Sequence, residues 1–289
     1  MGNPDIPGET EVAEMVQSLA DWLSKQPHLP RIQDDKVLLR KFLVNCKYRV
    51  QKAKTKIDQY YSARTAHPEI YLNRDPTSAA IQTISELCPV FPLPRRTPRG
   101  ELAIVARAEP QIEDIIPMDY LRYLTMVLDV LLLEEDKLDF LVIIDYRGFS
   151  FQHFLKFTTI AGLCTELMLE VYPGQYKGTH CVNVPPFIDS IVALLKRTVK
   201  PKLRDRVHVH TQLDTFHDLV SKDILPSDLG GADSSIKELN DMYRKKVESY
   251  GDWLRSQENV RSNEELRPAA SRDSMEMGIE GSFRRLRVD

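Results

Sequence analysis

The chain has 289 residues, of which 42% are hydrophobic and 28% are charged, a balance typical of a globular protein with a sizeable core. Its formal net charge of -3 excludes a chain-wide positive field for nucleic acid, so an anionic partner would need a local basic patch. The first ten residues lack the basic and apolar segments of a secretory signal. The four cysteines have no metal or disulfide spacing, which favours reduced core thiols in a cytosolic protein: Cys46, Cys88, Cys164 and Cys181.

The first part of the chain predicts a small all-helical module. Apolar residues recur at helical spacing in four segments: 11–26, 36–46, 50–65 and 78–87. Asp34 and Asp35 are suited to cap the second of these helices, and Pro68 ends the third. The proline-rich run C-P-V-F-P-L-P-R-R-T-P marks a change of texture near Val90. We therefore expect one domain over 1–90.

Beyond this boundary, strands and helices alternate, which favours an α/β sheet with crossover helices over 91–256. The expected strands are 101–106, 139–145, 180–184 and 207–210. The expected helices are 118–134, 150–171, 186–199, 214–222 and 235–255. The longest apolar run, 124–133, contains Asp129 and is too short to span a bilayer. The polar, weakly periodic residues 257–289 predict a largely flexible tail.

The helix expected over 186–199 has two apolar stripes. At 100° per residue, Phe187, Ile191 and Leu194 form one stripe, and the second consists of Ile188, Val192, Leu195 and Val199. Together they cover roughly 160° of the helix surface, more than a helix buried on one side needs. A helix wedged between two layers of the core would explain this width, and so would a helix that contacts something outside the protein.

Six cations follow within eleven positions, opposed by Asp205 alone: Lys196, Arg197, Lys200, Lys202, Arg204 and Arg206. Lys202 and Arg206 are four residues apart, so on a helix they repel each other unless an anion lies between them. An apolar stripe beside clustered cations is typical of a surface that docks on anionic lipid headgroups. An ordinary solvated face stays open as the alternative.

Four ordered motifs resemble those of the CRAL-TRIO family. L-L-R-K-F-L from Leu38 is similar to its helical module, and F-L-V-I-I-D-Y-R-G-F-S from Phe140 to its strand ending D-x-x-G. Y-P-G-Q-Y-K-G-T-H-C-V-N-V-P from Tyr172 matches Y-P-x-x-x-K-G-x-H-x-x-N-x-P, and I-L-P-S-D-L-G-G from Ile224 matches I-L-P-x-x-x-G-G. In texture the chain is most similar to the tocopherol and retinaldehyde carriers of the family and their insect relatives.

The resemblance implies a bowl-shaped mixed sheet with an apolar lipid cavity, closed by a gate helix at 183–206. It implies outward, membrane-facing positions at Phe151, Leu155, Phe187, Ile191 and Leu194. It implies cavity positions at Leu121, Thr125, Val142, Ile144, Leu167, Met168, Tyr172, Ile188, Val192 and Leu195. Each of these is also an acceptable core residue.

The resemblance also implies a basic cleft for phosphoinositide headgroups, at Lys177, Lys202 and Arg206. Gln175 and Cys46 stand where the tocopherol carrier has basic residues, so this cleft lacks two cations that Lys47 or Lys196 would have to replace.

The function implied is an intracellular carrier of one hydrophobic small molecule, exchanged at anionic membranes. We expect a cytoplasmic monomer with transient membrane contact, without a cofactor, a metal or a nucleic-acid partner. The alternative is a phosphoinositide-sensing adaptor that transfers no cargo.

Enzyme chemistry has little support in the residues. Asp145 ends a strand, where α/β sheets bind ligands, but no glycine-rich phosphate loop or nucleophile elbow accompanies it. A structural aspartate that caps the following turn is the better interpretation. His208 and His210 share one face of a strand, but no nearby ligand set completes a metal site. We therefore expect a protein that is not an enzyme.

Overall fold

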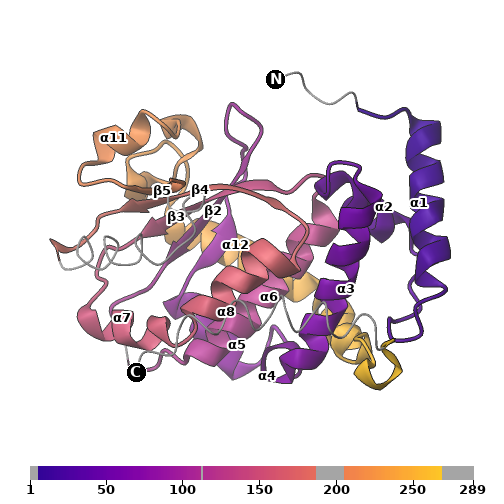
Figure 1. The fold of residues 1–289 in the computed structure, drawn as a ribbon. Coiled ribbons are helices and arrows are strands. Elements are labelled where there is room, and N and C mark those ends of the chain that lie inside the picture. Colours follow the sequence, from indigo (N-terminus) through magenta and orange to yellow (C-terminus); the bar gives the residue numbers. More distant parts are fainter. Residues whose placement is uncertain (1–5, 112, 187–204, 269–289) are drawn as a thin grey trace, which may run out of the picture.

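The computed structural model describes residues 6–111, 113–186 and 205–268, and a five-stranded mixed sheet organises the second half of it (Figure 1). The strands lie in chain order: β1 (Val90–Pro92), β2 (Leu102–Arg107), β3 (Asp139–Asp145), β4 (Gln175–Val182) and β5 (Val207–Val209). β1 is antiparallel to β2, and all other neighbours are parallel. The α/β class and the helical N-terminal module are thus confirmed.

Helices lie before, between and after these strands in the described residues. Before the sheet lie α1 (Glu9–Leu23), α2 (Lys36–Asn45), α3 (Val50–Ala66), α4 (Pro68–Tyr71) and α5 (Ala79–Leu87). Between the strands along the chain come α6 (Pro117–Glu134), α7 (Phe151–Thr158), α8 (Ala161–Glu166) and the π-helix η1 (Leu167–Val171). After β5 come α11 (Leu213–His217), α12 (Ile236–Ser249) and α13 (Gly251–Ser256). Short 3-10 turns lie at Lys222–Ile224, Ser227–Leu229, Gln257–Asn259 and Glu264–Leu266.

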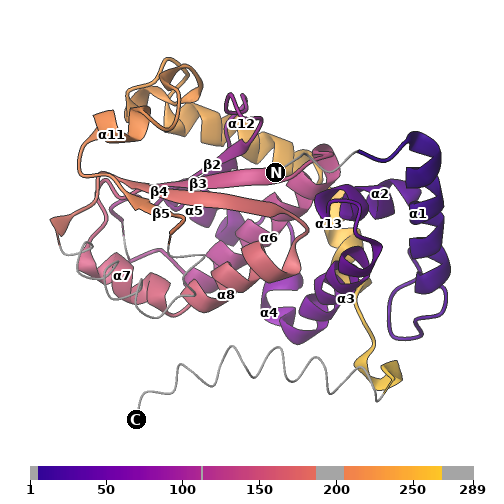
Figure 2. The ribbon, with the colours of Figure 1, turned by 45° about the horizontal axis from the view of Figure 1, so that its top comes forward.

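The two faces of the sheet pack into separate hydrophobic cores, because successive side chains of a strand point to opposite faces. On the first face, Ile104 and Val142 belong to the core shared with α6 and the N-terminal helices. On the second, Val105 and Ile143 pack with residues of α11 and α12. We call these the α6 face and the α12 face. Figure 2 shows the sheet between its two helical layers, with α1–α3 beside them.

The helical module is docked on the sheet domain through Asn45 at the end of α2. The Asn45 amide donates to the carbonyl of Asp136 (3.1 Å), and its oxygen accepts from the backbone N–H of Leu138 (2.6 Å). Asp35 caps the same helix at its start, accepting from the N–H of Leu38 at 2.9 Å, as predicted. The interior of the module is apolar, with Leu39 and Phe42 fully buried.

Several predicted elements differ in extent from the structure. The helix predicted over 150–171 divides, because the hydroxyls of Thr158 and Thr159 bond the carbonyls three residues before them and end α7. The strand predicted at 180–184 begins earlier, at Gln175, because its polar residues find partners across the sheet, such as Asp139 for Lys177. The helix predicted over 214–222 ends at His217, and the one over 235–255 divides at Tyr250.

Residues 257–268 pack on the helical module, whereas the polar sequence of 257–289 predicts a largely flexible tail. The N–H of Asn263 donates to the carbonyl of His28 (2.7 Å), and Thr65 donates to that of Ser262 (2.7 Å). Arg267 is 4% exposed and donates to both carboxylate oxygens of Asp58 at 2.9 and 2.7 Å. These residues therefore fasten the end of the described chain to its beginning.

Candidate functional site

A buried carboxylate on α6 joins the two parts of the chain. Asp129 accepts hydrogen bonds from Tyr60 (2.6 Å) and Tyr172 (2.8 Å) through one oxygen. Its other oxygen accepts from Arg64 (2.9 Å) and Arg74 (2.6 Å). Tyr60 and Arg64 come from α3, whereas Tyr172 opens the Y-P signature before β4. All five side chains are buried. We call this group the Asp129 cluster.

The Asp129 cluster holds its charge in the interior because its partners outweigh desolvation. Burial alone would raise the pKa of the Asp129 carboxyl, but Arg64 and Arg74 bring that pKa below its ordinary value. Sequence reasoning noted Asp129 only as an interruption of an apolar run. A lone acid within a predicted buried helix was the available signal, because such a charge requires a partner.

A further buried cation, Lys56, lies at the contact between α3 and η1. The Lys56 ammonium donates to the backbone carbonyls of Leu169 (3.0 Å) and Glu170, where the helix ends with unpaired carbonyls. Burial lowers the pKa of Lys56 to about 8. The module therefore holds the segment that carries Leu167 and Met168, two of the predicted cavity positions.

The predicted cavity positions that the structure describes gather on the α6 side of the sheet. Leu121, Val142, Leu167 and Tyr172 belong to its core, Ile144 and Met168 pack against it, and Thr125 is buried on α6. Leu121, Thr125 and Leu167 have no exposed surface, so cargo contact would require them to be uncovered. Tyr172 directs its hydroxyl at Asp129 rather than into open space. Ile144 and Met168 keep part of their surface exposed.

Three side chains on this side are partly exposed although protein surrounds most of each one. Tyr120, Tyr146 and Cys164 are half-buried. Yet desolvation raises the pKa of Cys164 to about 12, and it raises the pKa of both phenols above their ordinary value. Each of these side chains is thus surrounded by protein while part of its surface stays accessible. Surface that is accessible but enclosed in this way is expected for the wall of an internal space.

Aromatic side chains extend this wall from α6 to α7. Tyr120 packs edge-on against Phe157 with ring centroids 5.4 Å apart, and Phe157 lies 6.2 Å from Phe149. Phe149 packs edge-on against Tyr146 at 5.0 Å. Phe149 and Phe157 are themselves only partly buried. None of these four positions was named from the sequence, because an internal wall cannot be distinguished from an ordinary core by spacing.

Two of the predicted basic positions lie together at the start of β4 and β5. The ammonium of Lys177 is 3.1 Å from Asp139, which also pairs with Lys137 at 3.1 Å. Arg206 donates to the carbonyl of Tyr176. Gln175 begins β4, and Cys46 is 1% exposed with its pKa raised by burial, so its thiol is neutral. Asp139 thus offsets part of the positive charge.

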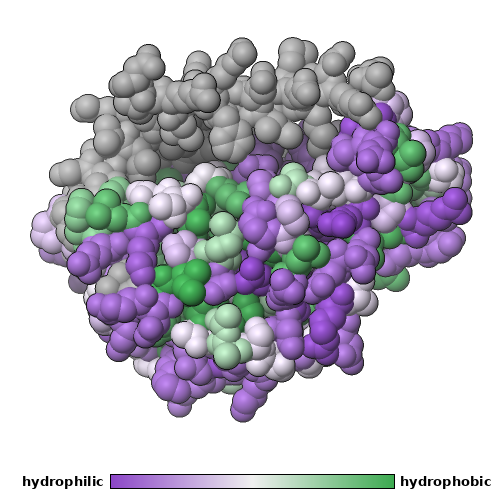
Figure 3. Space-filling view, turned by 90° about the horizontal axis from the view of Figure 1, so that it is seen from below, coloured by the Kyte–Doolittle hydropathy of each residue, from purple (hydrophilic) through white to green (hydrophobic). Residues whose placement is uncertain are grey.

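The exposed hydrophobic positions predicted on the helix after β3 are on the surface. Phe151 and Leu155, one turn apart on α7, are 54% and 52% exposed. Ile116, just before α6, is 55% exposed, and Lys156 of α7 donates to the carbonyl of its neighbour Ile115 (3.0 Å). Figure 3 shows the underside of the molecule, where hydrophobic groups are interspersed among hydrophilic ones.

Asp145 has the structural role that we preferred. It accepts from the N–H of Arg147 (3.0 Å), two residues on, and from the amide of Asn183 (2.7 Å). Asn183 is itself held at a positive φ of 52°. The bond therefore fixes the end of β4, from which the predicted gate segment departs.

The histidines on the α12 face form a stack. His180 lies between His208 and His210, with ring centroids 5.0 and 5.3 Å away, and its Nδ1 is 3.0 Å from Nε2 of His210. Burial, followed by the two neighbouring imidazoles, lowers the pKa of His180 to about 4. Within the described residues, no group of three or more His, Cys, Asp or Glu side chains could hold a metal.

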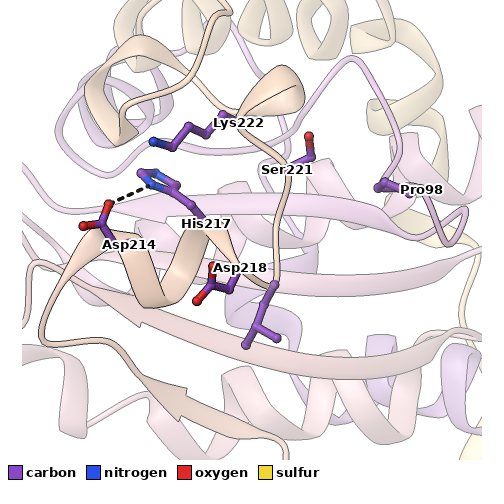
Figure 4. A pocket seen from close by; sticks show the side chains of 7 residues that line it. Pro98, Asp214, His217, Asp218, Ser221 and Lys222 are labelled. Carbon is purple, nitrogen blue, oxygen red and sulfur yellow. Dashed lines mark ion pairs between the residues drawn. The ribbon is translucent and has the colours of Figure 1, made fainter.

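Two surface hollows lie away from the predicted site. The larger, of about 610 Å³, is lined by residues of and after α11, among them His217, Asp218 and Lys222, and includes Pro98 (Figure 4). The other, of about 300 Å³, lies between β1, α6 and α12. No helix in the described parts of the chain is both long and apolar enough to cross a membrane.

Comparison with known proteins gives the family. A family model described as CRAL/TRIO domain matches residues 90–231, and one described as Pinta-like, UBA domain matches residues 8–81. The chain belongs to the CRAL-TRIO family. This family comprises lipid-binding and lipid-transfer proteins, which is the general function that membership indicates.

The curated relatives are longer than this chain. Clavesin-1 of Xenopus laevis is 28% identical over 238 residues, covering 79% of this chain and 69% of that protein. The alpha-tocopherol transfer protein-like protein of Homo sapiens is 31% identical over 224 residues, covering 75% of this chain and 64% of that protein. The chain therefore spans about two thirds of the length of each.

A solved CRAL-TRIO structure supports the fold. The crystal structure of Sfh5 superposes with a TM-score of 0.53, at 14% identity, over 83% of this chain and 93% of that one. Two motif glycines show why the family pattern requires them. A Cβ on Gly178 would lie 2.9 Å from the carbonyl oxygen of Arg206, and one on Gly231 would lie 1.9 Å from that of Leu225.

Part of the predicted CRAL-TRIO site lies outside the described residues. These positions are Phe187, Ile188, Ile191, Val192, Leu194, Leu195 and Lys202, together with Lys196 and most of the predicted gate. They stay predictions.

Proposed function

We propose that this protein carries one hydrophobic small molecule between membranes. The observation that carries the proposal is the row of packed aromatic rings from α6 to α7, in which Tyr120, Phe157, Phe149 and Tyr146 each keep part of their surface exposed. Burial of an apolar ligand against such a wall releases apolar surface from water, which is the main source of affinity in a preformed cavity. Ile144 and Met168, partly exposed on the same side, extend the proposed binding surface.

The proposed membrane contact is made by the hydrophobic side chains on and beside α7. Phe151 and Leu155 are half-exposed, and Ile116 adds a third exposed apolar group next to that helix. Exposed apolar side chains gathered on one surface are typical of peripheral membrane contact. Phe187, Ile191 and Leu194 would extend this contact if the predicted gate docks on the bilayer.

The proposed headgroup contact is made by Lys177, Arg206 and Lys202, with Lys137 as a further cation next to Lys177. Cations near an anionic surface each contribute about 1 kcal/mol of attraction. Membrane binding can favour cargo release only if the membrane binds the open state of the protein more tightly than the closed state through these residues.

A vesicle transfer assay tests the proposal. The purified full chain is mixed with donor vesicles containing an NBD-labelled tocopherol and acceptor vesicles containing an anionic lipid. We expect the chain to speed transfer, and Phe151→Ser with Leu155→Ser to slow it several-fold. Leu219→Ser with Met242→Ser removes two other exposed hydrophobic side chains and is the matched control.

The possible outcomes separate the carrier from the adaptor. Faster transfer that depends on Phe151 and Leu155 supports the carrier. Binding to anionic vesicles without any faster transfer would support an adaptor and count against the carrier. An equal loss in the control pair would contradict the assigned membrane surface.

A further inference from the structure

The smaller of the two surface hollows, of about 300 Å³, lies at the β1 edge of the sheet, where the two hydrophobic cores meet. On its wall, Leu102 and Leu131 belong to the core of the α6 face, whereas Leu93 and Leu239 belong to that of the α12 face. We call it the edge hollow. Tyr120 and Leu131 are about 16 Å apart along the axis of α6, so the edge hollow lies apart from the aromatic wall.

The four charged side chains that line the edge hollow form two ion pairs. Lys246 lies 2.8 Å from Glu134, which also accepts a hydrogen bond from Tyr250. Arg96 pairs with Glu135. Each carboxylate therefore has its own cation, and the rim presents no excess of either sign. Since most of the remaining lining is apolar, the edge hollow suits an uncharged molecule.

Tyr243 of α12 supplies a polar group to the edge hollow. Its side chain is partly exposed, whereas its hydroxyl oxygen is buried and makes no hydrogen bond within the described residues. The carboxylates that act on this phenol, Glu134 and Glu135, are engaged by Lys246 and Arg96. Burial raises the pKa of Tyr243, so the phenol keeps its proton. A buried donor without an acceptor is unfavourable, and an acceptor that entered between α6 and α12 would relieve it.

The size of the edge hollow and the residue at its mouth restrict the occupant further. Ligand pockets run from about 300 to 1,000 Å³, so this hollow suits a small molecule rather than a lipid with long chains. Met242 lines it and is 63% exposed. The unbranched thioether of methionine adapts to the shape of what it contacts, so this side chain can move as a molecule enters.

We infer that the edge hollow is a second ligand site, which binds a small, neutral, largely apolar molecule with one hydrogen-bond acceptor, such as a ketone or an ester. Tyr243 donates to that acceptor, and the apolar residues of β1, α6 and α12 enclose the rest of the molecule. This site is independent of the proposed carrier function, because none of the residues that line it belongs to the aromatic wall.

NMR of the methionine methyl groups in the purified full chain tests this site. The Met242 signal reports on the edge hollow, and the Met168 signal reports on the α6 side of the sheet. The probes are benzylacetone, butylbenzene, which lacks the carbonyl, and hydrocinnamate, which carries a carboxylate in its place. We expect benzylacetone to shift the Met242 signal with a Kd up to about tenfold lower than that of butylbenzene, as one net hydrogen bond allows. Hydrocinnamate should bind more weakly than benzylacetone, and in Tyr243→Phe the preference for the ketone should disappear.

Tyr123→Phe is the control, because it removes another buried hydroxyl that has no partner within the described residues and does not line the edge hollow. It should keep the preference for the ketone. A preference that survives Tyr243→Phe, or equal binding of ketone and hydrocarbon by the unaltered chain, would overturn the role of Tyr243.

Tightest binding of hydrocinnamate would overturn the neutral ligand. Probes that shift the Met168 signal alone, or no signal at all, would overturn the small-molecule site, and the second result would favour a protein partner. A chain that fails to transfer lipid between vesicles but keeps the Met242 response would lose the carrier function and retain this site.

Discussion

The hydroxyl of Tyr172 donates a 2.8 Å hydrogen bond to the carboxylate of Asp129, inside the molecule. Tyr172 opens the Y-P signature of the CRAL-TRIO domain, whereas Arg64, which binds the same carboxylate, belongs to α3 of the N-terminal module. One buried charge therefore couples the helices at the start of the chain to the segment that leads into β4.

Replacing Asp129 by Asn should destabilise the whole fold. The two buried guanidinium groups of Arg64 and Arg74 would lose their counter-charge, and breaking a buried ion pair in this way costs about 3–5 kcal/mol. Urea denaturation measures the loss. Asp136→Asn is the control. Asp136 pairs with Lys41 at 3.5 Å but is 81% exposed, so the loss of this pair should cost less than about 1 kcal/mol. Equal effects of the two variants would contradict a special role for the Asp129 cluster.

Stability should rise with pH in the alkaline range because of Lys56. The pKa of Lys56 is about 8 in the folded chain, against 10.5 for an ordinary lysine, so between these pH values the unfolded chain binds more protons. Stability from this group therefore increases across that window, by up to about 3 kcal/mol, and is lost as the pH falls to 8.

The difference between the unaltered chain and Lys56→Met isolates this contribution, since other titrating groups are common to both. Between pH 8 and pH 10, the urea midpoint of the unaltered chain should rise relative to that of the variant. Parallel pH dependences would show that Lys56 keeps an ordinary pKa in the folded chain.

Replacing Arg267 by Ala should loosen the helical module without affecting the sheet. Arg267 donates to the partly buried Asp58 and, at 2.6 Å, to the buried Ser62, so the change leaves both acceptors without their charged donor at a cost of about 1–3 kcal/mol. Hydrogen exchange should accelerate in α1 and α3 but not in β2 or β3. Arg261→Ala, at an exposed position nearby, should change neither. Unaltered exchange in α1 and α3 would mean that residues 257–268 do not brace the module.

Replacing Asp139 by Asn should strengthen binding to anionic vesicles. The change frees the ammonium groups of Lys137 and Lys177, both 3.1 Å from the carboxylate, to interact with lipid headgroups. Co-sedimentation at low salt should show tighter binding, and the gain should shrink as salt is added. Lys177→Ala with Arg206→Ala should weaken binding, whereas Lys237→Ala with Lys245→Ala, an equal charge loss on α12, should not. Weaker binding by Asp139→Asn would contradict the assigned headgroup surface.

The fold could be predicted well where local signals agree with burial. The apolar run of β3 has the bounds predicted for it, Asp139–Asp145, and Asp35 caps α2 as expected. The breaks were harder to predict, because the end of α7 depends on the hydroxyls of Thr158 and Thr159 rather than on periodicity.

The candidate site was predictable in part, by its motifs rather than by its chemistry. The resemblance names Ile144, Met168 and Lys177, which stay predictions as site residues. It could not identify Tyr120, since partial exposure inside a protein depends on how α6, α7 and α8 pack. Nor could it pair Arg267 with Asp58, because the contact joins residues far apart in the chain.

The most direct test of the carrier is native mass spectrometry of the purified full chain, followed by denaturation and organic extraction. The account predicts a complex heavier than the 33.2 kDa chain by one small, largely apolar molecule, which denaturation releases and extraction recovers in stoichiometric amount. A chain that shows only its own mass, both as purified and after incubation with a lipid extract, would contradict the account.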